Sequence, residues 1–187
     1  MPNPVPLKVG DNVHIRPGGQ FFYEYQPDRV QKLLLIAGGI GITPLLSIYR
    51  HFNDNTSLHS TERMPSTKRA SGVKLLYSCR SIAEMPFGPE VTRLAMRNRL
   101  LQVELGITQL KGLDMDEVLE LSKVCPKVHL GRFGEMKLQV ELEELGGASS
   151  PALEVYLCGP PAMIDDMKEK LIKCGVNEEK IHYERWC

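Results

Sequence analysis

Apolar residues fall into short continuous runs that alternate along the chain with longer segments of helical pattern. A run of four to eight apolar residues is typical of a strand buried on both faces. The predicted strands span residues 33–37, 73–78, 101–105, 154–158 and 180–183. The predicted helices span residues 43–52, 89–98, 114–124, 135–145 and 162–174.

This alternation of strands and helices predicts an α/β fold. Such a pattern is typical of a Rossmann-like, mostly parallel sheet with helices on both faces. Ligands of these sheets bind beyond the carboxyl ends of the strands. We therefore expect the functional residues to follow strands directly.

Two further segments stand outside this alternation. The opening segment alternates Val9, Val13 and Ile15 with polar residues and ends in a Pro-Gly-Gly string, which predicts a strand and then a turn. Residues 24–31 read as a short polar connector. Residues 53–72 are polar, rich in Ser and Thr and without a period, so they predict an exposed insertion.

Composition narrows the class of protein. At about 150 residues per domain, 187 residues fit one domain, or one domain with a fragment. The 42% hydrophobic and 25% charged residues are typical of a globular protein. The formal net charge is zero, which argues against a protein that binds nucleic acid and against a polybasic protein that binds a membrane surface. No apolar run approaches the roughly 18 residues of a membrane span.

The cysteines indicate neither a disulfide framework nor a metal site. There are five, an odd number, and no Cys-x-x-Cys pair occurs. Thiols of this kind suggest a reducing intracellular compartment, cytoplasmic or mitochondrial. The N-terminus carries no recognisable targeting pattern.

The string Ala-Gly-Gly-Ile-Gly-Ile-Thr-Pro directly follows the first buried run. Gly38, Gly39 and Gly41 allow a sharp turn and a close approach of phosphate to main-chain N–H groups. Thr43 suits a helix N-cap, and Pro44 suits the first helical position. A helix N-terminus at such a turn favours an anion, although a tight turn without a ligand is equally compatible with the spacing.

A second string, Leu-Cys-Gly-Pro-Pro-Ala-Met, also lies between a strand and a helix. Gly159 and the prolines that follow predict a rigid turn, with Cys158 at the end of the strand. Taken alone, a lone cysteine here is more often a small buried hydrophobic residue than a reactive group.

Together these strings resemble one family. AGGIGITP, YLCGPPAM about 120 residues later and the terminal HYERW resemble the NAD(P)-binding half of ferredoxin–NADP reductases. That family includes cytochrome b5 reductases and the reductases of bacterial oxygenases. The resemblance covers about residues 33–186.

The resemblance assigns roles to the residues of both strings. In the first string, the residues at the cofactor would be Gly38, Gly39, Gly41, Ile42, Thr43 and Pro44. Cys158 would lie beside the nicotinamide C4. The residues that shape the pocket around it would be Gly159, Pro160 and Met163. Glu184 and Trp186 would lie at the flavin edge, although Cys187 follows the aromatic residue and plain packing is the alternative for Trp186.

Coenzyme choice should depend on the residues after the second strand. NAD enzymes usually place a carboxylate there and NADP enzymes an arginine. Ser78, Arg80 and Ser81 are available, and no carboxylate precedes Glu84. Arg80 would suit the 2′-phosphate of NADP, whereas the resemblance favours NAD, so we expect NAD and keep NADP open.

Smaller candidates occur elsewhere. Arg132 follows Gly131 as in the family, and either contacts the cofactor or is a solvated charge. His129 and His182 lie in strand-like contexts and are expected to be packed histidines. The acidic run 141–144 predicts a solvated helix face.

The flavin-binding string Arg-x-Tyr-Ser/Thr of the family is absent from the sequence. The opening segment resembles the last strand of the flavin barrel, which divides the chain into a barrel remnant with connector, 1–31, and an NAD(P)-binding domain, 32–187. The resemblance implies hydride transfer from NAD(P)H to FAD and on to an unknown electron acceptor. FAD would be held by a separate flavin domain and would not be retained by this chain. The alternative is an NAD(P)-binding module without turnover, acting as a sensor or partner subunit.

Overall fold

The computed structural model describes residues 8–14, 19–57, 71–125 and 127–185. Its centre is a six-stranded sheet in the order β4-β3-β2-β1-β5-β6, in which every neighbouring pair is parallel. The strands are β1 (Lys32–Gly38), β2 (Gly72–Cys79), β3 (Leu101–Ile107), β4 (Val128–Leu130), β5 (Leu153–Gly159) and β6 (Ile181–Arg185). This is the predicted Rossmann-like fold.

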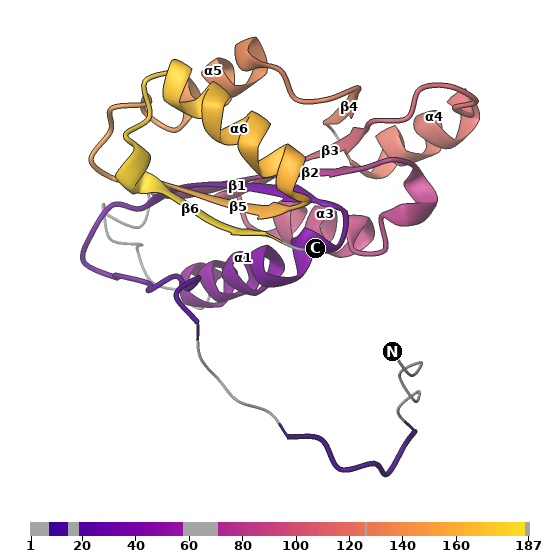
Figure 1. The fold of residues 1–187 in the computed structure, drawn as a ribbon, viewed down its shortest axis with the longest axis horizontal. Helices are drawn as coiled ribbons and strands as arrows, with labels where there is room; N and C mark the ends of the chain where they lie inside the picture. The colour runs from indigo at the N-terminus through magenta and orange to yellow at the C-terminus, as the bar shows by residue number, and fades with distance from the viewer. Residues whose placement is uncertain (1–7, 15–18, 58–70, 126, 186–187) are drawn as a thin grey trace.

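Helices cover both faces of the sheet, with α1 and α3 on one face and α5 and α6 on the other (Figure 1). The helices are α1 (Ile42–Ser57), α3 (Gly88–Arg97), α4 (Met115–Val124), α5 (Glu135–Glu144) and α6 (Pro161–Lys173). Helix α4 packs beside the edge strand β4. None of the described helices is long and apolar enough to cross a membrane.

The central strand β1 shows why the apolar runs form strands. It lies between β2 and β5, and its side chains alternate between the two faces as the pleat requires. Leu33 and Leu35 enter the core under α1, whereas Leu34 and Ile36 enter the core under α5 and α6. Because helices shield both faces of β1 from water, side chains on both faces must be apolar, and this requires a continuous apolar run in the sequence.

Helix α1 extends to Ser57, five residues beyond the predicted end, so the first part of the predicted insertion is helical. The reason is tertiary. Thr56 is 5% exposed, and its hydroxyl donates to the carbonyl of Phe52 (2.8 Å) and accepts from the Asn98 side chain (2.8 Å). These contacts stabilise the last turn of α1, whose polar sequence shows no helical pattern of apolar residues. Residues 58–70 of the predicted insertion lie outside the described residues.

The strand predicted in the opening segment is wrong for residues 8–14, which form no strand and expose Val9 and Val13. A strand needs a neighbouring backbone for its hydrogen bonds. Ile15 and the first two residues of the predicted turn 17–19 lie outside the described residues. The polar connector predicted for 24–31 is not wholly solvated, because Tyr25 packs on the core beside α1, as does Tyr23 just before it.

Candidate functional site

A cleft of about 360 Å³ opens at the carboxyl edge of the sheet. It is lined by Ile36, Gly38, Gly39, Ser78, Cys79, Arg80, Glu84, Thr108, Arg132, Phe133, Pro160, Ala162, Met163, Asp166 and Met167. Most of these residues lie near the end of a strand or follow one, and the others belong to the first half of α6. The cleft therefore lies where parallel sheets bind their ligands.

The glycine turn forms one wall of this cleft. After Gly38, residues Gly39–Gly41 make a short 3-10 turn that leads directly into α1. Gly39 has a φ of +54°, and a Cβ there would meet no atom within 4 Å. Its backbone therefore faces open space, so a ligand can approach the N–H groups at the start of the helix closely.

Gly41 has a different task. A Cβ on Gly41 would lie 2.2 Å from the carbonyl oxygen of Cys158 and 2.7 Å from the backbone nitrogen of Gly159. Only a glycine lets the start of α1 press this closely on β5. Gly41 thus sets the position of the turn, and it does not line the cleft.

The predicted helix start is wrong in detail. The helix begins at Ile42, which is buried, so Thr43 lies inside the first turn and is not the N-cap. The Thr43 hydroxyl donates to the carbonyl of Ile40 (2.7 Å), and Pro44 is the third helical residue. The 3-10 turn extends the helix toward the glycines, which moves its free N–H groups to the cleft. Ile42, Thr43 and Pro44 do not line the cleft.

In the second string, too, some residues line the cleft and others do not. Pro160 and Met163 line the cleft, as the resemblance implied, and Ala162 joins them. Cys158 is 0% exposed, belongs to the core beneath α1 and is absent from the cleft lining, as is Gly159.

The residues predicted at the flavin edge lie elsewhere. Glu184 is exposed on β6, opposite Cys158 in the strand register. Trp186 lies outside the described residues. Of the predicted catalytic residues that the structure describes, neither Cys158 nor Glu184 lines the cleft.

Arg80 and Glu84, which follow β2, form an ion pair in the lining of the cleft. The Arg80 guanidinium lies 3.1 Å from the Glu84 carboxylate, and both side chains are largely exposed. Ser78 donates to the carbonyl of Ala37 (3.3 Å). Glu84, four residues after the arginine, is the first carboxylate after β2, and it lines the cleft.

Sequence reasoning undervalued the loop after β4. Arg132 and Phe133 both line the cleft. A Cβ on Gly106 would lie 2.9 Å from the Phe133 ring, so the glycine in β3 provides the space in which this ring packs. The signal was Gly106 near the end of a predicted strand, followed in the next strand-loop unit by Gly131 and Arg132.

The acidic residues and the cysteine that line the cleft are ion-paired or protonated. Burial raises the pKa of the Cys79 thiol, so this cleft residue stays protonated near neutral pH and is a poor nucleophile. Asp166 is paired with Lys170 (2.6 Å). Within the described residues, no group of His, Cys, Asp and Glu side chains could hold a metal ion.

Comparison with known proteins agrees with this geometry. A sequence profile described as the oxidoreductase NAD-binding domain matches residues 35–169. Oxidoreductase NAD-binding domain-containing protein 1 from Homo sapiens is 30% identical over 177 residues, covering 93% of this chain and 52% of that protein. The flavohemoprotein of Vibrio cholerae is 28% identical, covering 95% of this chain and 36% of that protein.

A solved structure shares the fold. The flavohemoglobin from Malassezia yamatoensis, with bound FAD and heme, has a TM-score of 0.60 and 26% identity, covering 88% of this chain and 33% of that one. The chain spans about half the length of curated relatives that it matches. The predicted likeness to the ferredoxin–NADP reductase and cytochrome b5 reductase group is confirmed. The chain therefore belongs to the oxidoreductase NAD-binding domain family.

Proposed function

We propose that the chain binds NAD(H) in the cleft and presents the nicotinamide to a flavin, as the pyridine-nucleotide module of a flavin-dependent oxidoreductase. The observation that carries this proposal is the cleft itself. A glycine turn with an open backbone at Gly39 and an arginine at position 132 face the same space at the carboxyl edge of the sheet. Open N–H groups and a guanidinium are the donors that a pyrophosphate requires.

Different residues of the chain would then bind different parts of the dinucleotide. The pyrophosphate would lie at the glycine turn, with Arg132 as its counter-charge. The adenosine ribose would lie near Arg80 and Glu84. Because Glu84 neutralises Arg80 and would repel a 2′-phosphate, the pair favours NAD over NADP.

Bound NADH supplies a hydride for transfer to a flavin, and the chain's own residues provide position. Pro160 and Met163 would shape the space for the nicotinamide ring. The roles of Cys158, Glu184 and Trp186 stay predictions. For Cys158, contact with the nicotinamide requires an exposure of the thiol to the cleft that is absent here.

The flavin would come from a separate flavin domain, because the family's Arg-x-Tyr-Ser/Thr string is missing from this sequence. FAD would therefore not be retained by this chain, and the electron acceptor is open. The same missing string favours one alternative function, a nucleotide-binding module without turnover that serves as a sensor or a partner subunit.

Calorimetry with NADH tests the proposal. We expect saturable binding by the chain, and at least about tenfold weaker binding, or about 1.4 kcal/mol, for Arg132→Ala. Arg29→Ala is the matched control, because this exposed arginine precedes β1 at the opposite edge of the sheet. Equal affinities for all three proteins would refute the assignment. NADH oxidation that appears on adding a flavin domain separates the oxidoreductase from the module without turnover.

A further inference from the structure

Two glycines end the strands at which the strand order of the sheet reverses. The chain passes from β1 to β2, β3 and β4 on one side, and β5 lies on the other side of β1. Gly38 ends β1, and Gly159 ends β5. Open α/β sheets bind their ligands in the crevice at such a reversal. The side chain that fills this crevice therefore decides how much room a ligand has.

The backbone conformation of Gly38 does not require a glycine. Its φ of −117° and ψ of 117° are extended, a conformation that any residue adopts. The next residue, Gly39, differs, because its φ of +54° lies in the left-handed region. The reason for a glycine at position 38 therefore lies in its surroundings.

Met163 fills the space in which a Cβ of Gly38 would lie. The added carbon would lie 2.3 Å from the Met163 Sδ and 3.4 Å from its Cε. The same Cε would lie 3.0 Å from a Cβ on Gly159. Met163 belongs to the first turn of α6 and is partly buried. Its thioether thus packs against Gly38 and Gly159, which together form what we call the glycine seat.

Met163 also forms part of the cleft lining. A methionine side chain is unbranched and has three rotatable bonds, so its end can move at low cost. On another side the seat is bounded by Pro160, whose Cδ would lie 3.1 Å from a Cβ on Gly38. Because the cleft is the open space that Met163 borders, a thioether pushed off the glycine seat moves into the cleft.

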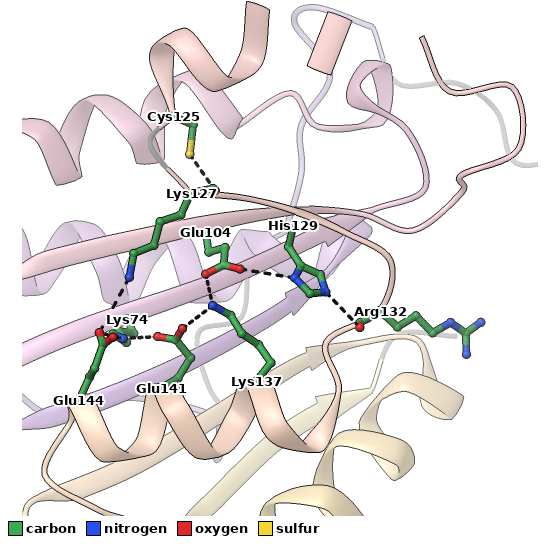
Figure 2. Close-up of polar contacts among 9 residues, drawn as sticks. All are labelled: Lys74, Glu104, Cys125, Lys127, His129, Arg132, Lys137, Glu141 and Glu144. Carbon is green, nitrogen blue, oxygen red and sulfur yellow. Dashed lines mark hydrogen bonds and ion pairs between the residues drawn. The ribbon is translucent and has the colours of Figure 1, made fainter. Parts of the chain in front are cut away.

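The loop after β4, which also lines the cleft, is held in place by its own contacts. The carbonyl oxygen of Arg132 accepts a hydrogen bond from His129 Nε2 (3.2 Å) (Figure 2). Gly131 donates to the carbonyl of Ile107 (2.8 Å). The rings of His129 and Phe133 lie with their centroids 4.9 Å apart. Because this part of the lining is fixed, a thioether that enters the cleft reduces the room for a ligand.

We propose that Gly38 is a positioning residue, which keeps the Met163 thioether on the glycine seat and so keeps the cleft open for the nicotinamide half of NADH. This inference rests on the proposed function. Gly38 then acts on the ligand through Met163, and not through a direct approach of phosphate to its own backbone. Shortening Met163 should therefore cancel the effect of a side chain at position 38, whereas it would leave a direct effect on phosphate unchanged.

Calorimetry with NADH on Gly38→Ala, Met163→Ala and the double variant tests this coupling. Gly38→Ala should weaken binding about tenfold, or about 1.4 kcal/mol, because the displaced thioether competes with the ligand for space. In the Met163→Ala background, the same substitution should change affinity by less than about twofold. Gly38→Ala should stay folded, with a Tm lowered by no more than about 4 °C, because its nearest neighbour is the end of a flexible side chain.

Met167→Ala is the matched control for the methionine. Met167 also lines the cleft from α6, but it is not among the three atoms nearest to a Cβ on Gly38. In the Met167→Ala background, Gly38→Ala should keep its tenfold effect. An effect of Gly38→Ala that is absent, or equal in the Met163→Ala and Met167→Ala backgrounds, would overturn the inference.

Gly88→Ala is the matched control for the glycine. A Cβ there would lie 3.4 Å from the Sδ of Met85, so this glycine also packs against a methionine. Neither Gly88 nor Met85 lines the cleft. Gly88→Ala should leave NADH affinity unchanged, and a tenfold loss in this variant would contradict a specific role of the glycine seat.

A measurement without ligand separates failure of this inference from failure of the proposed function. In NMR spectra of the chain with isotope-labelled methionine methyl groups, the Met163 methyl should show a nuclear Overhauser contact with the α protons of Gly159. This contact should be lost in Gly38→Ala. A contact that persists in Gly38→Ala overturns the inference. A contact that is lost there, in a chain whose wild type does not bind NADH, refutes the proposed function alone.

Discussion

The close contact of Gly41 with β5 allows a quantitative prediction for Gly41→Ala. The added methyl group would lie 2.2 Å from the carbonyl oxygen of Cys158 and 2.4 Å from its carbonyl carbon. Reaching ordinary contact requires a shift of about 1 Å or more. Strand β5 resists this shift because it is paired with β1 on one side and β6 on the other.

The cost follows from the kind of neighbour. Overpacking a well-packed site costs about 1–3 kcal/mol, and sometimes more. Here the neighbours are backbone atoms in the middle of a sheet, so we expect the upper end, about 3 kcal/mol. For a chain of this size, that corresponds to a fall in Tm of roughly 6–12 °C. The displaced turn should also weaken NADH binding.

Thermal unfolding followed by circular dichroism measures the effect. Gly72→Ala is the matched control, since its nearest atom, the carbonyl oxygen of Leu100, would lie 3.7 Å from the new Cβ, an ordinary contact. Its stability should change by less than about 1 kcal/mol. If Gly41→Ala unfolds within about 1 °C of the wild type, the turn does not press on β5 and the packing described for this wall of the cleft is incorrect.

Three further predictions concern charge. Lys74→Met removes a partner from the buried Glu141 and should lower the free energy of unfolding by about 3 kcal/mol in urea denaturation; unchanged stability would contradict a buried pair. Burial opposes ionisation of Glu141, but hydrogen bonds from Lys137 and Lys74 outweigh it and hold its pKa below the ordinary 4.5. Its contribution is therefore complete above pH 4.5 and lost as pH falls through the lower folded pKa, so urea midpoints should drop in acid, and less so in Glu141→Gln. Glu84→Gln releases Arg80 and should raise the affinity for NADPH relative to NADH about tenfold by calorimetry, whereas a constant ratio would remove this pair from coenzyme choice.

The strands were predictable because burial on both faces leaves a strong sequence signal. The end of α1 was not, because Thr56 is held by Asn98, far away in the sequence. The opening strand failed because alternation of Val9 and Val13 says nothing about whether a neighbouring strand exists. In each case the missing information is a tertiary contact that local pattern does not carry.

The same limit applies to the candidate site, where the sequence predicted some features and others depend on the tertiary structure. Gly39 and Arg80, expected from the rule that ligands bind at strand ends, and Met163, expected from the resemblance, all line one cleft, and their roles there stay predictions. The direction in which the Cys158 side chain points depends on the pleat of β5, and it points into the core. The acidic run 141–144 is a solvated face only in part, because Glu141 is 2% exposed and paired with Lys74, whereas Glu143 and Glu144 are exposed.

NMR mapping of NAD⁺ binding to the chain tests the central claim most directly. Backbone amides at the carboxyl edge, at Gly39, Arg80 and Arg132, should shift saturably with a single dissociation constant. Amides at the opposite edge, near Glu154 and Lys180, should stay unchanged. The absence of saturable shifts, or shifts centred on that opposite edge, would contradict the assignment of this cleft as the nucleotide site.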